Sequence, residues 1–328
     1  MALLEVRHLR VDLRTHRGSA PAVRDVGFTL ERGDTLGLIG ESGCGKSMTA
    51  LALMGLAPDN ATVSGSVRLN GQELIGLGDR GWRELRGNRI AMIFQEPMTA
   101  LNPVHRVGAQ IAEPLILHRG MTAAAARTRT IELMTRVGIP EPVRRVDSFP
   151  HQFSGGQRQR LMIAMALACE PDVLIADEPT TALDVTVQKQ ILALIRELVQ
   201  ERGMALVLIS HDLGLVAQNV RRMLVMYGGR VVETGKVEEL FYDPRHPYTL
   251  GLLNSTPNVE KKMARLNSIN GAPPNLEHLP RGCAFHPRCA FRFEQCFAAV
   301  PQLESFGQGT RKKACFYAEA LTAAESAA

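Results

Sequence analysis

The sequence predicts an α/β fold, and three buried-strand patterns carry that prediction. Residues 35–39 (TLGLI), 173–176 (VLIA) and 205–209 (ALVLI) are short apolar runs, which are typical of parallel strands covered on both faces. A glycine-rich loop and an expected helix over residues 46–56 follow the first run. An amphipathic helix near residues 186–201 separates the other two. Strands that alternate with helices in this way favour a parallel sheet.

The bulk composition is that of a soluble globular protein. The 328 residues are 45% hydrophobic and 22% charged, and this length allows one large domain or two smaller ones. The longest apolar runs, such as residues 161–168, are about half of the roughly 18 residues that span a bilayer. The N-terminus lacks the layout of a signal peptide. We therefore expect a cytosolic chain that reaches a membrane only through a partner.

Patterning along the chain predicts a boundary near residue 243. Residues 1–39 alternate apolar and polar positions between turn residues, which favours an antiparallel β-layer. Residues from about 97 to 165 are expected to form a mainly helical subdomain. After residue 243, Pro and Gly become frequent and four cysteines appear. We predict one domain over residues 1–243 and a small cysteine-containing extension over residues 244–328.

The glycine-rich loop after the first buried strand matches the pattern GxxxxGK(S/T). Its glycines let backbone N–H groups point at phosphate oxygens, at a helix N-terminus whose dipole favours anions. Lys46 would reach the β- and γ-phosphates, and the Ser47 hydroxyl would coordinate Mg²⁺. The flanking strand and helix disfavour the alternative, a glycine turn with an incidental Lys-Ser pair. The predicted nucleotide-binding residues are Gly40, Glu41, Ser42, Gly43, Cys44, Gly45, Lys46, Ser47 and Met48.

Two acidic residues, Asp177 and Glu178, close the second buried strand. The strand carries Asp177 to its C-terminal end, where open α/β sheets bind ligands. Asp177 would hold the magnesium shell, and Glu178 would polarise the attacking water as a general base. Two solvated acids at a strand end are the alternative, which the upstream phosphate loop disfavours.

Four further motifs lie in order along the chain: Gln95 in IFQEP, residues 153–157 (FSGGQ), Asp184 in ALD and His211 in ISHD. FSGGQ resembles the LSGGQ signature of ABC-type ATPases, with Phe in place of Leu. The others resemble the Q-loop, D-loop and switch histidine of that family. The chain is thus similar to an ABC-type P-loop ATPase, which implies catalytic roles for Glu178, His211 and Gln95. Gln95 would also contact Mg²⁺.

The signature residues Ser154, Gly155, Gly156 and Gln157 are expected to open a helix, so that N–H groups form an anion site. The resemblance implies that this site closes on the γ-phosphate held by a second subunit. Family members usually stack adenine on an aromatic residue before the first long strand, yet residues 1–27 contain no Phe, Tyr or Trp. His16 is the candidate here, and an exposed loop histidine is the alternative.

Residues 96–103 (EPMTALNP) and 244–249 (PRHPYT) resemble segments of the ATP-binding subunits of bacterial dipeptide, oligopeptide and nickel importers. A simple Pro-rich linker is the alternative for the second segment. The resemblance covers essentially the whole chain and is strongest to the first, D-type ATPase of dipeptide permeases. It implies an ATP-hydrolysing subunit that powers import of dipeptides or short oligopeptides, with nickel or glutathione as alternative cargo.

The same resemblance implies the partners and the location. They are a second, homologous ATPase subunit in a heterodimer, two membrane-spanning permease subunits and an extracytoplasmic peptide-binding protein. The chain would then be peripheral, on the cytoplasmic face of the bacterial inner membrane. In this family the Gln95 loop and the helices after it dock a cytoplasmic helix of the membrane subunits. An exporter cassette is disfavoured, because residues 244–249 fit importers.

Four late cysteines follow the spacing C-x5-C-x6-C-x18-C: Cys283, Cys289, Cys296 and Cys315. In a reducing cytosol, clustered cysteines favour metal ligation over disulfides. The spacing lacks a C-x2-C knuckle and does not choose the metal. The resemblance implies a 4Fe-4S iron–sulfur cluster, with zinc and free or disulfide-bonded cysteines as alternatives. Neighbouring basic residues would offset the negative charge of the thiolates: Arg281, Arg288, Arg292, Lys312 and Lys313.

The net charge of +5 gathers in the C-terminal extension, where Lys and Arg outnumber Glu. A nucleic-acid patch is one interpretation, and with it a soluble ABC ATPase of DNA repair or translation is the rival from another functional class. Such proteins usually carry two cassettes or long inserted arms, whereas this chain has one cassette and no coiled-coil heptads. We expect no nucleic-acid partner.

Overall fold

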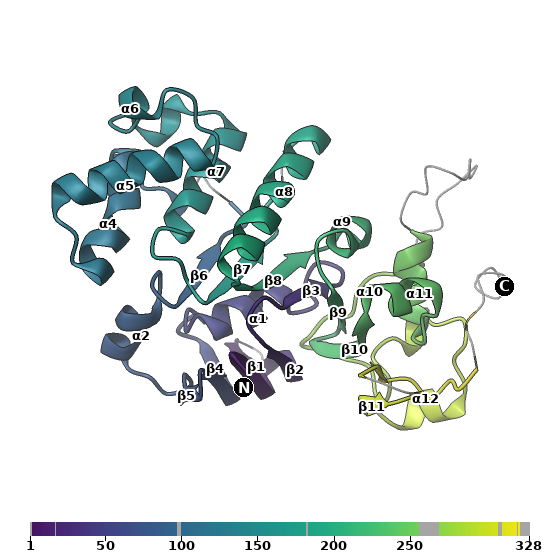
Figure 1. The fold of residues 1–328 in the computed structure, drawn as a ribbon. Coiled ribbons are helices and arrows are strands. Elements are labelled where there is room, and N and C mark those ends of the chain that lie inside the picture. Colours follow the sequence, from purple (N-terminus) through teal and green to yellow (C-terminus); the bar gives the residue numbers. More distant parts are fainter. Residues whose placement is uncertain are drawn as a thin grey trace. The chain divides into compact units, whose positions relative to one another are not determined.

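The structure is a computed structural model that describes residues 2–16, 18–96, 100–181, 183–255, 269–307, 310–319 and 321 (Figure 1). The chain forms two compact units. The helical unit comprises Met1–Leu4, Leu30–Asp34 and Leu69–Leu208. The phosphate-loop unit comprises Glu5–Thr29, Thr35–Arg68 and Ile209–Ala328.

The phosphate-loop unit is built on strands from the two ends of the chain. β3 (Thr35–Ile39) pairs in parallel with β9 (Arg222–Tyr227), and β10 (Arg230–Lys236) pairs antiparallel with β9. On its other edge β10 pairs with β12 (Lys312–Lys313), which in turn pairs with β11 (Glu304–Ser305). Strands of the predicted extension thereby join the sheet whose strand β3 leads into the phosphate loop.

The expected N-terminal β-layer is present. β2 (Gly18–Leu30), β1 (Leu4–Thr15) and β4 (Ala61–Leu69) are neighbours in that order in a second sheet. The alternating apolar residues of β1, such as Val6 and Val11, are buried, which explains the period-two pattern in the sequence.

Helix α1 (Lys46–Leu53) follows β3 and ends three residues before the predicted end at residue 56. The reason is Gly55, whose φ of 61° is left-handed. This conformation lets the N–H of Leu56 bond back to the carbonyl of Leu51 at 2.8 Å, which closes the helix.

The strands of the helical unit confirm the predicted buried runs. β6 (Ile90–Ile93) pairs in parallel with β7 (Val173–Asp177), and β8 (Ala205–Ser210) lies on the other side of β7. Every residue of β6, β7 and β8 is buried, as the continuous apolar runs require. Helix α8 (Val185–Arg202) connects β7 to β8 and matches the amphipathic helix predicted near residues 186–201.

Helices occupy much of the stretch predicted to be helical from about residue 97 to 165, of which residues 97–99 lie outside the described residues, and Figure 1 shows these helices grouped together in blue to teal. Helices α4 and α5 contact each other, and both contact α7. Thr122 caps α5 by accepting a hydrogen bond from the N–H of Ala125. The elements are α4 (Val107–Arg119), α5 (Ala123–Arg136), α6 (Pro142–Arg145), a 3-10 turn (Pro150–Gln152) and α7 (Gly155–Ala166).

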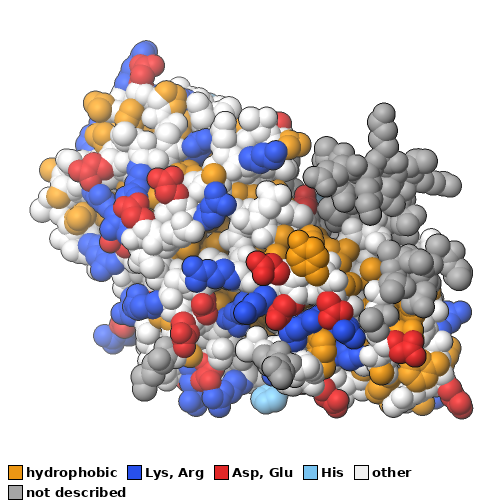
Figure 2. Space-filling view, turned by 45° about the vertical axis from the view of Figure 1, so that its right-hand side comes forward, with side chains coloured by type: hydrophobic (Ala, Val, Ile, Leu, Met, Phe, Trp, Pro, Cys, Tyr) orange, Lys and Arg blue, Asp and Glu red, His pale blue; other side chains and the backbone are white. Residues whose placement is uncertain are grey.

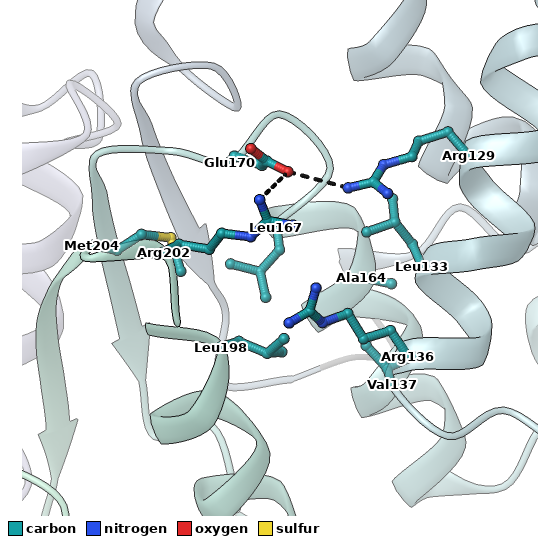
Figure 3. Close-up of a pocket in the computed structure, with 10 residues that line it drawn as sticks. All are labelled: Arg129, Leu133, Arg136, Val137, Ala164, Leu167, Glu170, Leu198, Arg202 and Met204. Atoms are coloured by element: carbon teal, nitrogen blue, oxygen red, sulfur yellow. Dashed lines mark hydrogen bonds and ion pairs between the residues drawn. The ribbon is translucent and has the colours of Figure 1, made fainter. Parts of the chain in front are cut away.

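A small cavity of about 20 Å³ lies between α5, α7 and α8 (Figure 3). Leu133 and Leu198 belong to its apolar lining. Arg129 and Arg202 both pair with Glu170, at 3.1 and 2.9 Å. The space suits about one water molecule, and none of the predicted site residues lines it, so it reflects helix packing.

The remaining elements are short. They are β5 (Gln72–Glu73), α2 (Asp79–Leu85), α9 (Leu213–Ala217), α10 (Val237–Tyr242), α11 (Pro247–Asn254), a 3-10 turn (His286–Arg288) and α12 (Glu294–Ala298). Among the described residues, no helix has the length and apolar character that crossing a membrane requires. Figure 2 shows acidic and basic side chains interspersed on the face it presents.

Candidate functional site

The predicted phosphate loop connects β3 to α1, and its shape depends on glycine at two positions. A Cβ on Gly40 would lie 2.3 Å from the carbonyl oxygen of Met226. A Cβ on Gly45 would lie 2.4 Å from the carbonyl oxygen of Ala22, and Gly45 has a φ of 103°. Both positions therefore exclude any larger residue, because neighbouring backbone passes too close.

Lys46 opens α1, and its side chain turns back into the loop. The side chain is buried (5% exposed), and its Nζ donates to the carbonyl oxygens of Gly40 at 2.8 Å and Glu41 at 3.1 Å. The loop thus encloses one cationic amine at a helix N-terminus, an arrangement that suits phosphate. Ser47 and Met48 follow in the first turn of α1.

Glu41 of the loop is held from the C-terminal part of the chain. Its backbone N–H donates to the Tyr248 hydroxyl at 2.8 Å. Its two carboxylate oxygens accept hydrogen bonds from Arg288 at 2.6 and 3.0 Å. Sequence reasoning missed this pair of contacts. Tyr248 lies in the PRHPYT run, so the sequence had drawn attention to this segment. Arg288 was expected to offset the charge of the cysteine thiolates, but it pairs with Glu41.

Tyr248 is itself firmly placed at the start of α11. Its N–H donates to Nδ1 of His246 at 3.0 Å, which caps the helix. Burial lowers the pKa of His246 to about 3, so the neutral ring keeps this acceptor nitrogen. The N–H of His246 in turn donates to the buried Glu233 of β10 at 3.0 Å.

The two acidic residues lie in the helical unit, where β7 ends, and this position at a strand end is the predicted one. Asp177 ends β7 and is 4% exposed. Glu178 follows with a left-handed φ of 44°, a strained conformation for a non-glycine residue. Its Oε2 accepts hydrogen bonds from Gln95 Nε2 at 3.2 Å and from Thr181 Oγ1 at 2.9 Å. The structure therefore brings Gln95 and Glu178 together and adds Thr181, which sequence reasoning missed.

The signature residues open α7, as predicted. Ser154 is the N-cap, and its hydroxyl accepts from the N–H of Gln157 at 3.4 Å. The side-chain oxygen of Gln157 accepts from the N–H of Ser154 at 3.2 Å, which completes a capping box. Ser154 and Gly155 are exposed, and Gly156 follows them in the helix.

The phenylalanine in the signature has a packing role. Phe153 is buried, and the guanidinium of Arg145 lies 4.1 Å from the centre of its ring. The aromatic ring thus fills an apolar position and gains a cation–π contact.

Three other predicted residues lie at the ends of elements. Asp184 is the N-cap of α8 and accepts from the N–H of Val187 at 2.9 Å, whereas its neighbour Ala182 lies outside the described residues. His211 directly follows β8 and is exposed. His16 is exposed in the turn after β1, and its role with adenine stays a prediction.

The four late cysteines line one small cavity of the phosphate-loop unit, together with aromatic residues that include Phe285 and Phe291. Burial, together with the charges of the other three cysteines, raises the pKa of Cys289 to about 12. Burial likewise raises the pKa of Cys315 to about 11. Within the described residues, no three His, Cys, Asp or Glu side chains lie close enough to hold a metal ion.

Two family descriptions match this chain. "ABC transporter" matches residues 23–181, and "Oligopeptide/dipeptide transporter, C-terminal region" matches residues 232–296. OppD of Salmonella typhimurium, described as an oligopeptide transport ATP-binding protein, is 52% identical over 314 residues, 96% of this chain and 93% of that protein. The chain belongs to the ABC transporter family. OppD of Escherichia coli is 50% identical over 315 residues, with the same two coverages.

Solved ABC cassettes share the fold. The dimeric post-hydrolysis structure of the ATP-binding cassette MJ0796 bound to ADP and Pi has a TM-score of 0.64 and 28% identity, and covers 71% of this chain and 98% of that chain. CbiO1 from Clostridium perfringens, part of an ABC transporter complex, has a TM-score of 0.61 and 27% identity, and covers 73% of this chain and 90% of that chain. The predicted ABC-type ATPase and the predicted resemblance to peptide-importer subunits are confirmed.

Proposed function

We propose that this chain is the ATP-hydrolysing subunit of a membrane importer for dipeptides or short oligopeptides. The observation that carries the ATPase part is the buried Lys46 amine, enclosed by a glycine-dependent loop at the start of α1. The peptide cargo rests on the relatives, which are described as oligopeptide transport ATP-binding proteins. Nickel and glutathione are the alternative cargoes.

The phosphate loop would hold the nucleotide. Backbone amides of residues 40–48 and the Lys46 amine would bind the β- and γ-phosphates. The hydroxyl of Ser47, the carboxylate of Asp177 and the side-chain oxygen of Gln95 are hard oxygen donors, which fit Mg²⁺. When bound, Mg²⁺ would neutralise the charge that develops on the phosphate oxygens. His16 is the proposed adenine contact.

Glu178 would take the proton of the attacking water. A general base needs a fixed carboxylate, and the bonds from Gln95 and Thr181 fix one oxygen of Glu178. Glu178 also has a left-handed backbone, a costly conformation that occurs at many active sites. His211 would assist as the switch histidine of the family.

The signature would act on ATP held by a second, homologous ATPase subunit. The exposed start of α7 supports this proposal, because the amide-bearing end of the helix remains open to solvent. The relative MJ0796 was solved as a dimer with ADP and Pi, which supports it too. Asp184 would lie at the same shared interface.

A groove of about 400 Å³ on the helical unit supports docking to a membrane subunit. Its lining comes mainly from α4 and includes Ile116 and Leu117. Leu117 is 70% exposed and Ile116 is 43% exposed. Apolar side chains left in water favour a protein contact. We assign the groove to a cytoplasmic helix of one of two permease subunits, with an extracytoplasmic peptide-binding protein upstream. The chain would then lie on the cytoplasmic face of the inner membrane.

The test is peptide uptake by the assembled complex. The chain is purified with its membrane partners and reconstituted into vesicles with ATP on the cytoplasmic side. Labelled dipeptide or short oligopeptide should accumulate, and Glu178→Gln should abolish accumulation while the complex still assembles. Accumulation of nickel or glutathione instead would reject the peptide cargo. Salt-dependent DNA binding at physiological ionic strength, without uptake, would support the nucleic-acid rival.

We further propose that Cys283, Cys289, Cys296 and Cys315 hold a 4Fe-4S cluster. Four thiols that line one aromatic cavity supply the ligand set that such clusters use. Zinc at the same four cysteines, and free or disulfide-bonded cysteines, are the alternatives. Anaerobically purified protein should be brown and contain iron and acid-labile sulfide, both lost in Cys289→Ser. A colourless protein with stoichiometric zinc would reject the cluster.

A further inference from the structure

Glu41 forms hydrogen bonds with three residues. Arg288 and Tyr248 lie in the C-terminal segment, and Lys46 lies in the phosphate loop. The Glu41 carboxylate and Arg288 form a two-bond pair, and the Arg288 side chain is only 5% exposed. Such paired bonds fix orientation as well as distance. Arg288 also donates to the carbonyl oxygens of Asn270 and Ile269, at 2.9 and 3.3 Å, so its guanidinium is anchored on both sides.

The third contact of Glu41 is with Lys46 of the phosphate loop. The carbonyl oxygen of Glu41 accepts a hydrogen bond from Lys46 Nζ at 3.1 Å. The backbone N–H of the same residue donates to Tyr248. The hydrogen bonds of the Glu41 N–H and carbonyl groups therefore fix the peptide groups on both sides of this residue. The carbonyl group in turn orients the Lys46 amine.

We propose that Arg288 and Tyr248 are positioning residues of the phosphate loop, through which the C-terminal segment sets how tightly the loop holds the phosphates of ATP. This inference rests on the proposed role of the loop in binding ATP. The segment that follows residue 243 is then part of the nucleotide-binding machinery. A loop already held in its binding shape loses less conformational freedom when the ligand binds, which raises affinity.

The choice of variants follows from the packing around these residues. The Tyr248 ring packs against Tyr227 and Phe285, with centroid distances of 4.6 and 5.4 Å, so Tyr248→Ala would also open a cavity. Tyr248→Phe removes only the hydroxyl. Arg288→Gln and Glu41→Gln each remove one charge of the pair, and Arg288→Lys keeps the charge without the planar fork. Arg292→Gln is the matched control, because Arg292 is exposed and donates to the Pro287 carbonyl rather than to the phosphate loop.

The experiment measures the dissociation constant of ATP, together with KM and kcat, for the full chain in its assembled complex. Arg288→Gln and Glu41→Gln should each weaken ATP binding about tenfold or more, since each breaks a charged hydrogen-bond pair. KM should rise more than kcat falls. The double variant should bind ATP about as weakly as Arg288→Gln alone, because both substitutions break the same Glu41–Arg288 pair. Arg288→Lys should restore part of the affinity, and Tyr248→Phe should weaken binding a few fold.

Three results would overturn the proposal. They are ATP affinities of Arg288→Gln and Tyr248→Phe within twofold of the unmodified protein, effects that add in the double variant, or an equal loss in Arg292→Gln. If Arg288→Gln does not fold, Tyr248→Phe alone decides the matter. Lys46→Ala tests the underlying function separately, because unimpaired ATP binding by that variant would reject the loop as the nucleotide site, whatever Arg288 does.

Discussion

The phosphate loop and the signature helix both present backbone amides at the start of a helix, but they are held by different means. Glu41 of the loop is fixed by Tyr248 and Arg288, which lie 207 and 247 residues later in the sequence. Ser154 of the signature is fixed by Gln157, three residues away, and stays exposed. The loop is thus built by tertiary contacts of its own chain. The signature is built locally and left open, as expected for a surface that a partner completes.

The largest effect is expected from Glu178→Gln, which should slow ATP hydrolysis without weakening ATP binding. Glu178→Gln removes the proton acceptor, so turnover should fall about 100- to 10,000-fold. The phosphate loop is untouched, so ATP binding should stay near normal. ATPase rates and ATP binding to the same complex check this. Hydrolysis at the normal rate would show that Glu178 is not the base.

Lys46→Ala removes the cationic amine of the phosphate loop. Loss of one electrostatic donor to the transferring phosphoryl group typically costs about 3–4 kcal/mol, which is about a hundredfold or more in rate. ATP binding should weaken as well, in contrast to Glu178→Gln. The same two assays distinguish the variants. A Lys46→Ala protein that binds ATP normally would contradict the site assignment.

A pair of glycine variants sharpens the comparison directly. Gly45→Ala places a Cβ 2.4 Å from the Ala22 carbonyl oxygen at a left-handed φ, so unfolding free energy should drop by about 2 kcal/mol or more. At Gly155 the new Cβ would meet Leu183 at 3.9 Å, an ordinary contact. Gly155→Ala should therefore leave stability unchanged but lower ATPase activity of the assembled complex.

Denaturant unfolding and ATPase assays on both variants check this pair. Equal losses of stability in Gly45→Ala and Gly155→Ala would show that the phosphate loop and the start of α7 are held in the same way. Full activity of Gly155→Ala in the complex would argue against a partner's phosphate at the signature.

The smallest effect should come from the local cap at the D-loop. Asp184→Ala removes the bond from the N–H of Val187, which should cost about 1 kcal/mol of stability. Asp184→Asn keeps an acceptor and serves as the control. Denaturant unfolding measures both, and a variant as stable as the unmodified protein would show that the cap contributes little.

The parts of the site that sequence patterns predicted are those that local chemistry specifies. β3 matches the predicted residues 35–39, and the glycine-lysine loop follows it directly. The capping box at Ser154 likewise uses neighbours in sequence. The end of α1 was misplaced, because Gly55 was not recognised as a helix terminator.

The contacts that escaped prediction join distant segments. No local pattern shows that Arg288 pairs with Glu41 rather than offsetting the charge of the cysteine thiolates. Its position next to Cys289 suggested one role, and tertiary packing gave it another. The bond from Thr181 to Glu178 spans only three residues. It could have been predicted from the run EPTT, which places a hydroxyl one turn beyond the acid.

The proposed sharing of each ATP site between two ATPase subunits is tested most directly by the rate of ATP hydrolysis per chain. The rate is measured for the isolated chain, held monomeric by dilution and verified by light scattering, and for the same chain in the assembled complex. We predict negligible hydrolysis by the monomer and rapid hydrolysis by the complex. A monomer that matches the complex would contradict the shared site.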